Sequence, residues 1–597
     1  MRDSHDSDVR GVRRRALLTS AAVGAAGLAG CLRRFRSTRG QGSPEQLSVD
    51  VYTLAGDYDA RATEIGRTLS ENLSAVGVDT ELVLLPEDEF RRETLINQEY
   101  DLFVSQYPEI RNPDFLRPLL HSSFTGEIGW QNPFNFTEFT VDELLITQQR
   151  ETGTERRDTV VELQRELARQ QPFVPVAVPD RVSATRSGRF GNWGRVDMQS
   201  SLSLLQVEPY DDAETLRLVS TDDRMTQNLN PLAVEYRNKG TLTRLLYDSL
   251  GRRYGGGDEI RPWAAREWQF EQTGTETVAT VTLNPDLRWH DGELVTADDV
   301  AFTIEFLQDT SLGAFDVSVP APQFRGRTSL IEAVETVDDE VLEIRFPDTD
   351  PGIAVRSLTL PILPRSKWEE KTVAPDIAGI ELSERVTEAL VWNNDEPVGS
   401  GPFVFESREE GQELHLRRYD DHILAREDGR PEEMATAFPD GVPFERISFS
   451  IVRSNSAAVQ ILTDDEADSV LTSLDSNAVP TIGRNPELEL NVTRSRALYL
   501  VGCNASRDPL RNPHFRRVVA RLLDKEFLVD DLFGGFATPA ASPLSGTSWL
   551  APEFEWNGTD PEVPFFGAEG ELDVDAARQE LRDIGFEYSS DGELLEQ

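Results

Sequence analysis

The sequence predicts a mixed α/β protein that folds into at least two lobes. The chain has 597 residues, more than one simple hydrophobic core holds, and 38% of them are apolar, which suffices for globular cores. Over residues 47–104, stretches with the period of a strand alternate with stretches with the period of a helix. This alternation is typical of βαβ units around a parallel sheet, and the rest of the chain indicates α/β structure with long insertions.

The amino-terminal alternation begins with an alternating apolar stretch at residues 47–54, a predicted strand. Apolar side chains that share one face predict a helix over residues 60–76, and Gly77 ends it. The pattern continues with a strand at residues 82–85, a short helix at 90–96 and a strand at 102–104.

The carboxyl-terminal part is predicted to be mainly helical. Asn512 and Pro513 supply a capping residue and a proline suited to the first position of a helix. A second helix over residues 527–532 ends at Gly534, and a third begins after Asp573. In the middle of the chain we expect strands at residues 280–283 and 341–346 around a helix at 298–307, which opens with the capping-box-like pair Thr296 and Asp299.

The charge balance excludes one class of partner. The chain carries 60 Lys plus Arg against 105 Asp plus Glu, a net charge of -45, so it repels nucleic acid. Lysine occurs only at positions 239, 367, 371 and 525, so nearly all the basic residues are arginine. A lysine-poor, acidic surface resembles proteins of salt-loving archaea, in which concentrated salt screens the self-repulsion.

The sequence carries no recognised motif for catalysis or metal binding. The six histidines form no HExxH pair and no Cys–His cluster, and no G-x-S-x-G elbow or P-loop occurs. We interpret His290, which precedes an Asp-Gly turn, as structural, and Cys503, in an apolar run, as a small core residue. The sequence therefore predicts a protein that is not an enzyme and holds no cofactor or metal.

The first 31 residues have the form of an export signal: a basic segment, a short apolar stretch over residues 16–28 and then small residues. Arg14-Arg15 followed by two leucines resembles a twin-arginine signal, and Leu28-Ala29-Gly30-Cys31 resembles a lipobox. The resemblance implies lipid attachment at Cys31, and the alternative is a plain signal anchor. Residues 32–46 are interpreted as a flexible tether, beyond which no segment predicts a membrane span.

Five ordered motifs lie at residues 230–232 with 245–250, 261–268, 287–300, 397–403, and 504 with 509–518. Together they resemble family 5 of the extracellular solute-binding proteins, which serve oligopeptide, dipeptide and nickel importers. The resemblance implies a two-lobed periplasmic-binding-protein-like fold of type II, the peptide-binding class, with a hinge and a central cleft.

The order of the motifs is unusual, because segments that close the family's chain resemble residues 47–176 of this one. We therefore predict a circular permutation, in which residues 210–597 followed by 47–205 restore the usual order. The alternative is that residues 47–205 form an independent domain. The expected division is signal 1–31, tether 32–46, part of lobe II 47–178, return to lobe I and connector 179–213, lobe I with an inserted subdomain 214–497, and the rest of lobe II 498–597.

In peptide-binding relatives, a carboxylate that follows an aromatic residue pairs with the free amino group of the ligand. The matching stretch is residues 105–113, in which Tyr107 stands for the aromatic residue and Glu109 for the acid. The stretch is one residue short, and Glu replaces the usual Asp. This role predicts that Glu109→Gln weakens capture of an amino-terminated peptide, and the alternative is that Glu109 is one more surface acid.

Four further residues are candidates for the ligand cleft. Asn504 follows a predicted strand near the hinge, with turn capping as the alternative, and Asn228 precedes the turn at Asn230. Tyr236 and Trp392 are aromatic candidates, with core packing as the alternative.

The resemblance implies the substrate-binding component of an ABC importer, which captures a peptide or similar small solute and presents it to a permease and its ATPase. We expect a monomer, lipid-anchored at the extracellular face of the cell membrane and exported by the twin-arginine signal. The alternative is a surface sensor or interaction protein that keeps the fold without transport, and a hydrolase is a third hypothesis.

Overall fold

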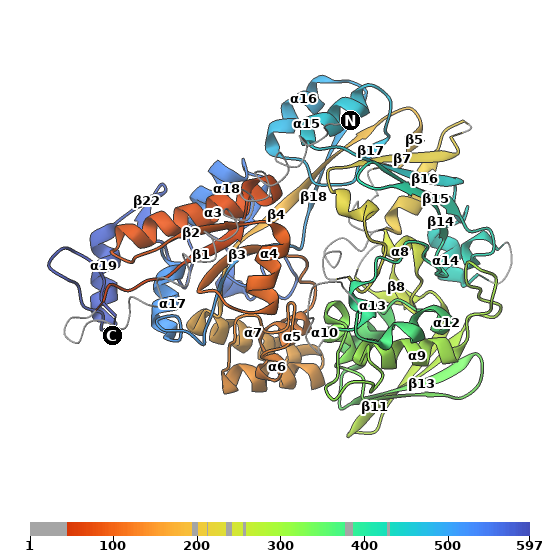
Figure 1. Cartoon of the computed structure of the whole chain (residues 1–597), viewed down its shortest axis with the longest axis horizontal. Helices are drawn as coiled ribbons and strands as arrows, with labels where there is room; N and C mark the ends of the chain where they lie inside the picture. Colours follow the sequence, from red (N-terminus) through yellow and green to blue (C-terminus); the bar gives the residue numbers. More distant parts are fainter. Residues whose placement is uncertain are drawn as a thin grey trace, which may run out of the picture.

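Two lobes lie side by side in the computed structural model (Figure 1). The structure describes residues 45–193, 201–211, 213–233, 242–254, 258–375, 386–426 and 430–596. Lobe I comprises the described residues of 183–494, and lobe II comprises 45–178 and 498–596. The largest core cluster draws its buried residues from 190–471, whereas the two main clusters of lobe II draw theirs from 47–178 and 498–594. The two-lobed α/β architecture predicted from the sequence is confirmed.

One large sheet runs through both lobes. Its strand order among the described residues is β14-β15-β16-β7-β17-β4-β19-β3-β1-β2, and β18 and β20 also pair with β4. In lobe II, β1 lies parallel to β2 and β3, as the strand–helix alternation predicts, while β19 pairs antiparallel with both β3 and β4. The elements of lobe II are β1 (Val51–Leu54), α3 (Gly56–Ala75), β2 (Leu82–Leu85), α4 (Glu87–Arg91), β3 (Leu102–Tyr107), α5 (Leu116–Leu120), α6 (Phe139–Arg150), α7 (Gly153–Gln170), β19 (Leu498–Cys503), α17 (Pro513–Ala520), α18 (Lys525–Leu532), β20 (Ala537–Pro539), β21 (Gly567–Ala568), β22 (Glu571–Leu572) and α19 (Val574–Asp583).

Lobe I combines its share of the large sheet with a separate four-stranded sheet of order β10-β11-β13-β12. In the large sheet β16, β7 and β17 are parallel, whereas β14 and β15 form an antiparallel edge. The elements are β5 (Phe190–Gly191), β6 (Glu208–Pro209), β7 (Thr215–Ser220), α8 (Thr243–Leu246), β8 (Gly251–Arg253), β9 (Ile260–Pro262), β10 (Ala265–Gln272), β11 (Glu276–Leu283), α9 (Ala297–Gln308), α10 (Arg325–Thr328), β12 (Ala333–Thr336), β13 (Val341–Pro347), α11 (Pro351–Ala354), η9 (Val355–Thr359), α12 (Arg365–Trp368), α13 (Glu388–Val391), β14 (Phe403–Glu409), β15 (Glu413–Arg418), α14 (Glu432–Ala437), β16 (Arg446–Ile451), α15 (Asn455–Thr463), β17 (Ser469–Val470), α16 (Val479–Arg484) and β18 (Leu488–Arg494).

Early and late parts of the chain share lobe II, so its ribbons are red to orange and blue in Figure 1. The backbone N–H of Leu47 donates to the carbonyl of Leu594 at 2.7 Å, and Leu594 donates to Gly77 at 2.8 Å. Gly77 has a φ of 101°, and a Cβ there would clash with the carbonyl of Gly592. The amino-terminal segment is therefore part of lobe II and not an independent domain, whereas the permutation itself stays a prediction.

Capping residues explain where several predicted helices begin. The Asn512 side chain accepts from the N–H of His514 at 2.9 Å before α17, and Asp573 accepts from Ala576 at 3.0 Å before α19. Thr296 and Asp299 form the expected capping box at the start of α9. The predicted short helix at residues 90–96 is confirmed, and it consists of the end of an α-helix at Glu87–Arg91 and a π-helical turn at Arg92–Ile96.

Two backbone crossings join the lobes. Strand β4 (Phe173–Arg186) pairs with β19 and β20 at its lobe II end and with β17 and β18 at its lobe I end. The second crossing is residues 495–497, which connect β18 to β19. Figure 1 shows β4 and β18 running together between the lobes. Two adjacent extended connections restrain translation of the lobes but leave rotation about the crossings available, as in a hinge.

Candidate ligand-binding site between the lobes

A buried ion-pair group holds the lobes together on one side. The carboxylate of Asp114, in lobe II, accepts from Nε of Arg117 at 2.9 Å and pairs with Nη1 of Arg356 from lobe I. Side-chain exposure is 0% for Asp114, 5% for Arg117 and 4% for Arg356. Arg117 also donates across the boundary to the carbonyl of Gly326 at 2.9 Å. We call Asp114, Arg117 and Arg356 the buried latch.

Other contacts across the boundary are more exposed. Asp258 of lobe I pairs with Arg111 at 3.1 Å and with Arg496, at the second crossing, at 2.6 Å. Arg325 pairs with Glu127 at 2.8 Å. Exposed ion pairs contribute about 0–1 kcal/mol each, so these contacts orient the lobes without locking them.

Tyr107 and Glu109 lie at the boundary, next to the buried latch. Tyr107 ends β3, is 7% exposed and packs edge-on against Trp130 with ring centroids 5.0 Å apart. Glu109 lies in the loop that follows, and its carboxylate is paired with the Nε of Arg111. Its side chain keeps 30% of its surface exposed. The predicted amine-binding acid is therefore already neutralised by an arginine of its own loop.

Asn504 has a structural position. It is 1% exposed, and its amide donates to the carbonyls of Gln98 at 3.2 Å and Tyr100 at 2.9 Å. Its Oδ1 accepts from the hydroxyl of Ser506 at 2.7 Å. With donors and acceptor used inside lobe II, Asn504 caps this loop, which corrects the predicted cleft role.

Two further predicted cleft residues, Asn228 and Trp392, pack within lobe I. Asn228 is 7% exposed, and its Oδ1 accepts from the N–H of Asn230 at 2.8 Å, which caps the turn. Trp392 packs edge-on against Trp368 with centroids 5.2 Å apart and carries Lys371 over its ring at 4.8 Å. Tyr236, like Cys31, lies outside the described residues.

The sequence reasoning missed a group of arginines beside Glu109. We call Arg111, Arg244, Arg253, Arg327 and Arg356 the interlobe arginine cluster; each of them lowers the pKa of another member or has its own pKa lowered by one. One signal was available in the sequence. Residues 317–331 hold two arginines and no acid, although acids outnumber bases in the whole chain.

The cluster members come from both lobes. Arg111 follows β3, while Arg244 lies on α8, Arg253 ends β8, Arg327 lies on α10 and Arg356 on η9. Figure 1 shows α5 and α10 facing each other where the lobes meet, close to these segments. Positive side chains from both lobes thus lie at the boundary between them.

A family profile described as bacterial extracellular solute-binding proteins, family 5 middle, matches residues 259–596, more than half of the chain. This chain belongs to that family.

Individual relatives of this family 5 member are distant. Heme-binding protein A of Haemophilus influenzae is 22% identical over 60% of the chain and 59% of its own length. Oligopeptide-binding protein AppA of Bacillus subtilis is 23% identical over 53% of the chain and 50% of its own length. The chain thus spans only about half to three fifths of the length of these curated relatives.

Solved structures resemble the family 5 member over a similar share. NikZ of Campylobacter jejuni, in complex with Ni(L-His), is 18% identical with a TM-score of 0.46, covering 64% of this chain and 66% of its own. AppA of Bacillus subtilis, in complex with a nonapeptide, is 16% identical with a TM-score of 0.44, covering 64% and 68%.

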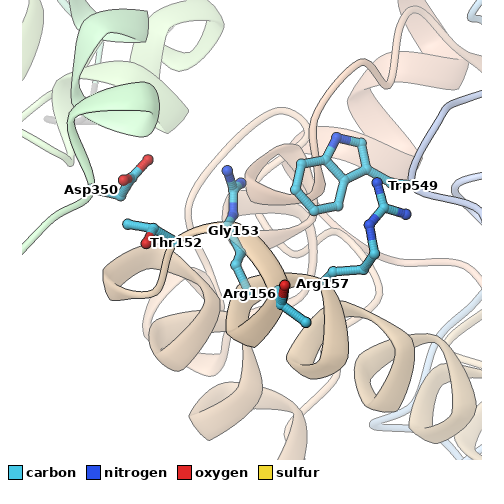
Figure 2. Close-up of a pocket in the computed structure, with 7 residues that line it drawn as sticks. Thr152, Gly153, Arg156, Arg157, Asp350 and Trp549 are labelled. Atoms are coloured by element: carbon cyan, nitrogen blue, oxygen red, sulfur yellow. The ribbon is translucent and has the colours of Figure 1, made fainter.

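A pocket of about 410 Å³ opens at the start of α7. Figure 2 shows Asp350 of lobe I across this pocket from Arg156 and Trp549 of lobe II. The Arg156 guanidinium donates to Asn112 at 2.7 Å and lies 4.7 Å from the Trp549 ring. Arg156 is therefore largely engaged by protein groups.

The two residues interpreted as structural are built into the core. His290 accepts from the N–H of Gly399 at Nδ1 and lies 3.0 Å from the Gly401 carbonyl at Nε2, and burial lowers the pKa of His290 to about 4. Cys503 is 0% exposed in β19, and burial raises the pKa of its thiol to about 12, which confirms the predicted core role. Within the described ranges, no group of three or more His, Cys, Asp or Glu is placed to hold a metal ion.

Proposed function

We propose that this protein is the substrate-binding component of an ABC importer, which captures a peptide or similar small solute outside the cell and delivers it to a permease and its ATPase. Membership of family 5 carries this proposal, and relatives named as oligopeptide-binding and peptide-binding proteins support it. The lobes, joined by two crossings, supply the hinge that such capture needs.

Capture works through a shift between open and closed arrangements of the lobes. A solute that touches both lobes gains contacts only when they are closed, so it stabilises the closed arrangement. Most of the ion pairs at the lobe boundary are partly exposed and weak. A ligand of moderate affinity can therefore shift the equilibrium between the open and closed arrangements. The permease then recognises the closed form, with the binding protein acting as a monomer.

The proposed location is the extracellular face of the cell membrane. Export by the twin-arginine route and lipidation of Cys31 place the soluble lobes there, and Cys31→Ser is expected to release the protein into the medium. Among the described residues, the structure contains no helix both long and apolar enough to cross a bilayer. Recovery of the Cys31→Ser protein in washed membranes would contradict the lipid anchor.

Uptake separates a transport receptor from a surface sensor. The ligand is identified by mass spectrometry of material copurified from a high-salt preparation, and its uptake is then measured in cells that lack this gene. Loss of uptake supports transport. Unchanged uptake together with binding of the same ligand to the purified protein supports the sensor instead.

We also propose that the chain order is a circular permutation of the family order. The pairing of residues 45–47 with 594–596 supports it, because a short linker can join these segments without moving either. A chain that runs from residue 213 to 596, through a Gly-Ser linker, and on from 45 to 207 is expected to fold and to bind the same ligand. Failure of this rejoined chain to fold, with the linker lengthened as a control, overturns the proposal.

A further inference from the structure

Three members of the interlobe arginine cluster lack a carboxylate partner. Within the described part of the chain, Arg244, Arg253 and Arg327 form no ion pair with an acid, whereas the other two members pair with Glu109 and Asp114. The chain as a whole has 105 acidic residues and 60 basic ones. With acids in such excess, most arginines are expected to have a carboxylate partner. A group of unpaired positive charges at the lobe boundary therefore needs a specific explanation.

These three arginines also keep unused donors. Arg244 makes no hydrogen bond to a described residue. Arg253 donates only from Nε, to the carbonyl of Asp258 at 3.1 Å, and Arg327 only from Nη1, to the Thr359 carbonyl at 2.9 Å and hydroxyl at 3.0 Å. Both Nη atoms of Arg253 and the Nε and Nη2 of Arg327 thus have no partner among the described residues.

Their electrostatic surroundings disfavour a positive charge. Burial, together with the charges of Arg244, Arg356 and Arg253, lowers the pKa of Arg327 to about 9, and no acid among the described residues acts in the opposite direction. Burial, together with repulsion from Arg111, lowers the pKa of Arg253 to about 10, although the charge of Glu109 acts in the opposite direction. An arginine remains charged at neutral pH, so these lowered pKa values report a free-energy cost of holding the charges together.

Arg244 is reachable from solvent. Its side chain is exposed, yet burial by the surrounding protein lowers its pKa. The two charged residues that act on Arg244, Glu109 and Arg111, belong to lobe II, so its guanidinium lies near the lobe boundary. A small ligand between the lobes can therefore reach the exposed guanidinium.

We infer that Arg244, Arg253 and Arg327 bind a ligand that carries at least two negative charges on carboxylate or phosphate groups. A guanidinium donates two parallel N–H bonds to either kind of oxyanion, and such charge-assisted bonds are stronger in a partly desolvated site. The ligand charge relieves the repulsion among the arginines, which favours the liganded, closed state. This inference rests on the proposed capture function and narrows the class of solute captured.

The test is calorimetric titration of the full-length mature protein at one fixed KCl concentration. The probes are citrate, pyrophosphate, triglutamate and, as the neutral control, trialanine. The variants are R244Q, R253Q and R327Q, each alone. The matched control is R266Q, because Arg266 lies on β10 in lobe I, is 53% exposed and has only a 3.7 Å contact with Glu267.

The expected result is that at least one of the three anions binds about tenfold or more tightly than trialanine, and that each cluster variant loses about tenfold in its affinity. R266Q leaves that affinity unchanged. Preference for citrate or triglutamate assigns a carboxylate ligand, and preference for pyrophosphate assigns a phosphate ligand. Equal binding of trialanine and the anions, or cluster variants that bind the anions as tightly as the parent, overturns the inference.

Thermal unfolding without ligand gives a second measurement. Because the cluster is repulsive when empty, R327Q and R244Q are expected to raise the Tm of the ligand-free protein by about 1–2 °C while they lose anion binding. A fall in Tm with unchanged anion affinity marks the arginines as structural and contradicts the inference. Binding of anions without any uptake by cells, by contrast, contradicts only the proposed transport function.

Discussion

The buried latch and the unpaired arginines face the same lobe boundary but balance their charges differently. In the buried latch, Asp114 neutralises two arginines at close range in a site closed to solvent. By contrast, Arg244, Arg253 and Arg327 form no ion pair with a carboxylate among the described residues, and Glu109 attracts Arg244 and Arg253 only at longer range. In the buried latch, the arginines are neutralised by a carboxylate of the chain and stabilise the contact between the lobes. An arginine that has no carboxylate partner and is reachable from solvent can instead bind an anionic ligand.

Breaking the buried latch should have the largest effect. Asp114→Asn leaves Arg117 and Arg356 buried without their carboxylate, which is expected to destabilise the protein by about 3–5 kcal/mol. Denaturant unfolding measures the loss, and small-angle scattering reports whether the lobes separate. The control is Asp258→Asn, whose more exposed ion pairs should cost about 1 kcal/mol or less. Similar losses in the two variants would break the distinction between buried and exposed boundary contacts.

A second buried carboxylate with positively charged partners, Asp248, lies inside lobe I, and its contribution to stability can be tested by varying the pH. Asp248 lies 3.2 Å from Nε2 of His422, accepts from the Trp263 indole at 2.7 Å and lies 3.4 Å from Arg252. Burial alone would raise the pKa of Asp248, but His422 and Arg252 outweigh burial, so it lies below the ordinary 3.8.

Because the folded-state pKa of Asp248 is lowered, its stabilising contribution is present above pH 3.8 and is lost as the pH falls through the lowered value. Asp248→Asn is expected to cost about 3 kcal/mol at pH 7 and to flatten the fall in stability at acid pH. Unfolding free energies between pH 2.5 and 7 measure both, with the exposed Asp420→Asn as control. An unchanged acid slope in Asp248→Asn would contradict this assignment.

Glu109 is paired with Arg111 and lies near the unpaired arginines. Its substitution should have the smallest effect of those considered. Glu109→Gln removes a negative charge beside Arg111, Arg244 and Arg253, so anion affinity is expected to rise about threefold with a stability change below about 1 kcal/mol. Titration with citrate and trialanine measures the change. Weaker trialanine binding with unchanged citrate binding would instead support the amine-binding role first predicted for Glu109.

The sequence located most elements near Leu47–Val104 and Asn512–Ile584, because capping residues and apolar periodicity are local signals. It did not delimit β4, since Pro175 and Pro179 interrupt the strand pattern. Pairing with β18, β19 and β20 overrides that local signal. The residues of the cleft were harder to predict from the sequence. Asparagines such as Asn504 and Asn228 occur in caps as well as in ligand sites, and only their contacts in the structure distinguish the two roles.

The sequence by itself determined the mixed α/β class, the family and the acidic charge balance, since these depend on composition, periodicity and ordered motifs. Only the tertiary structure decided that the amino-terminal segment completes lobe II and that Glu109 is paired with Arg111. It alone brought arginines from α8, β8, α10 and the loop after β3 together. The physical reason is that electrostatic energy depends on distances in space, and residues more than a hundred positions apart in the chain set those distances here.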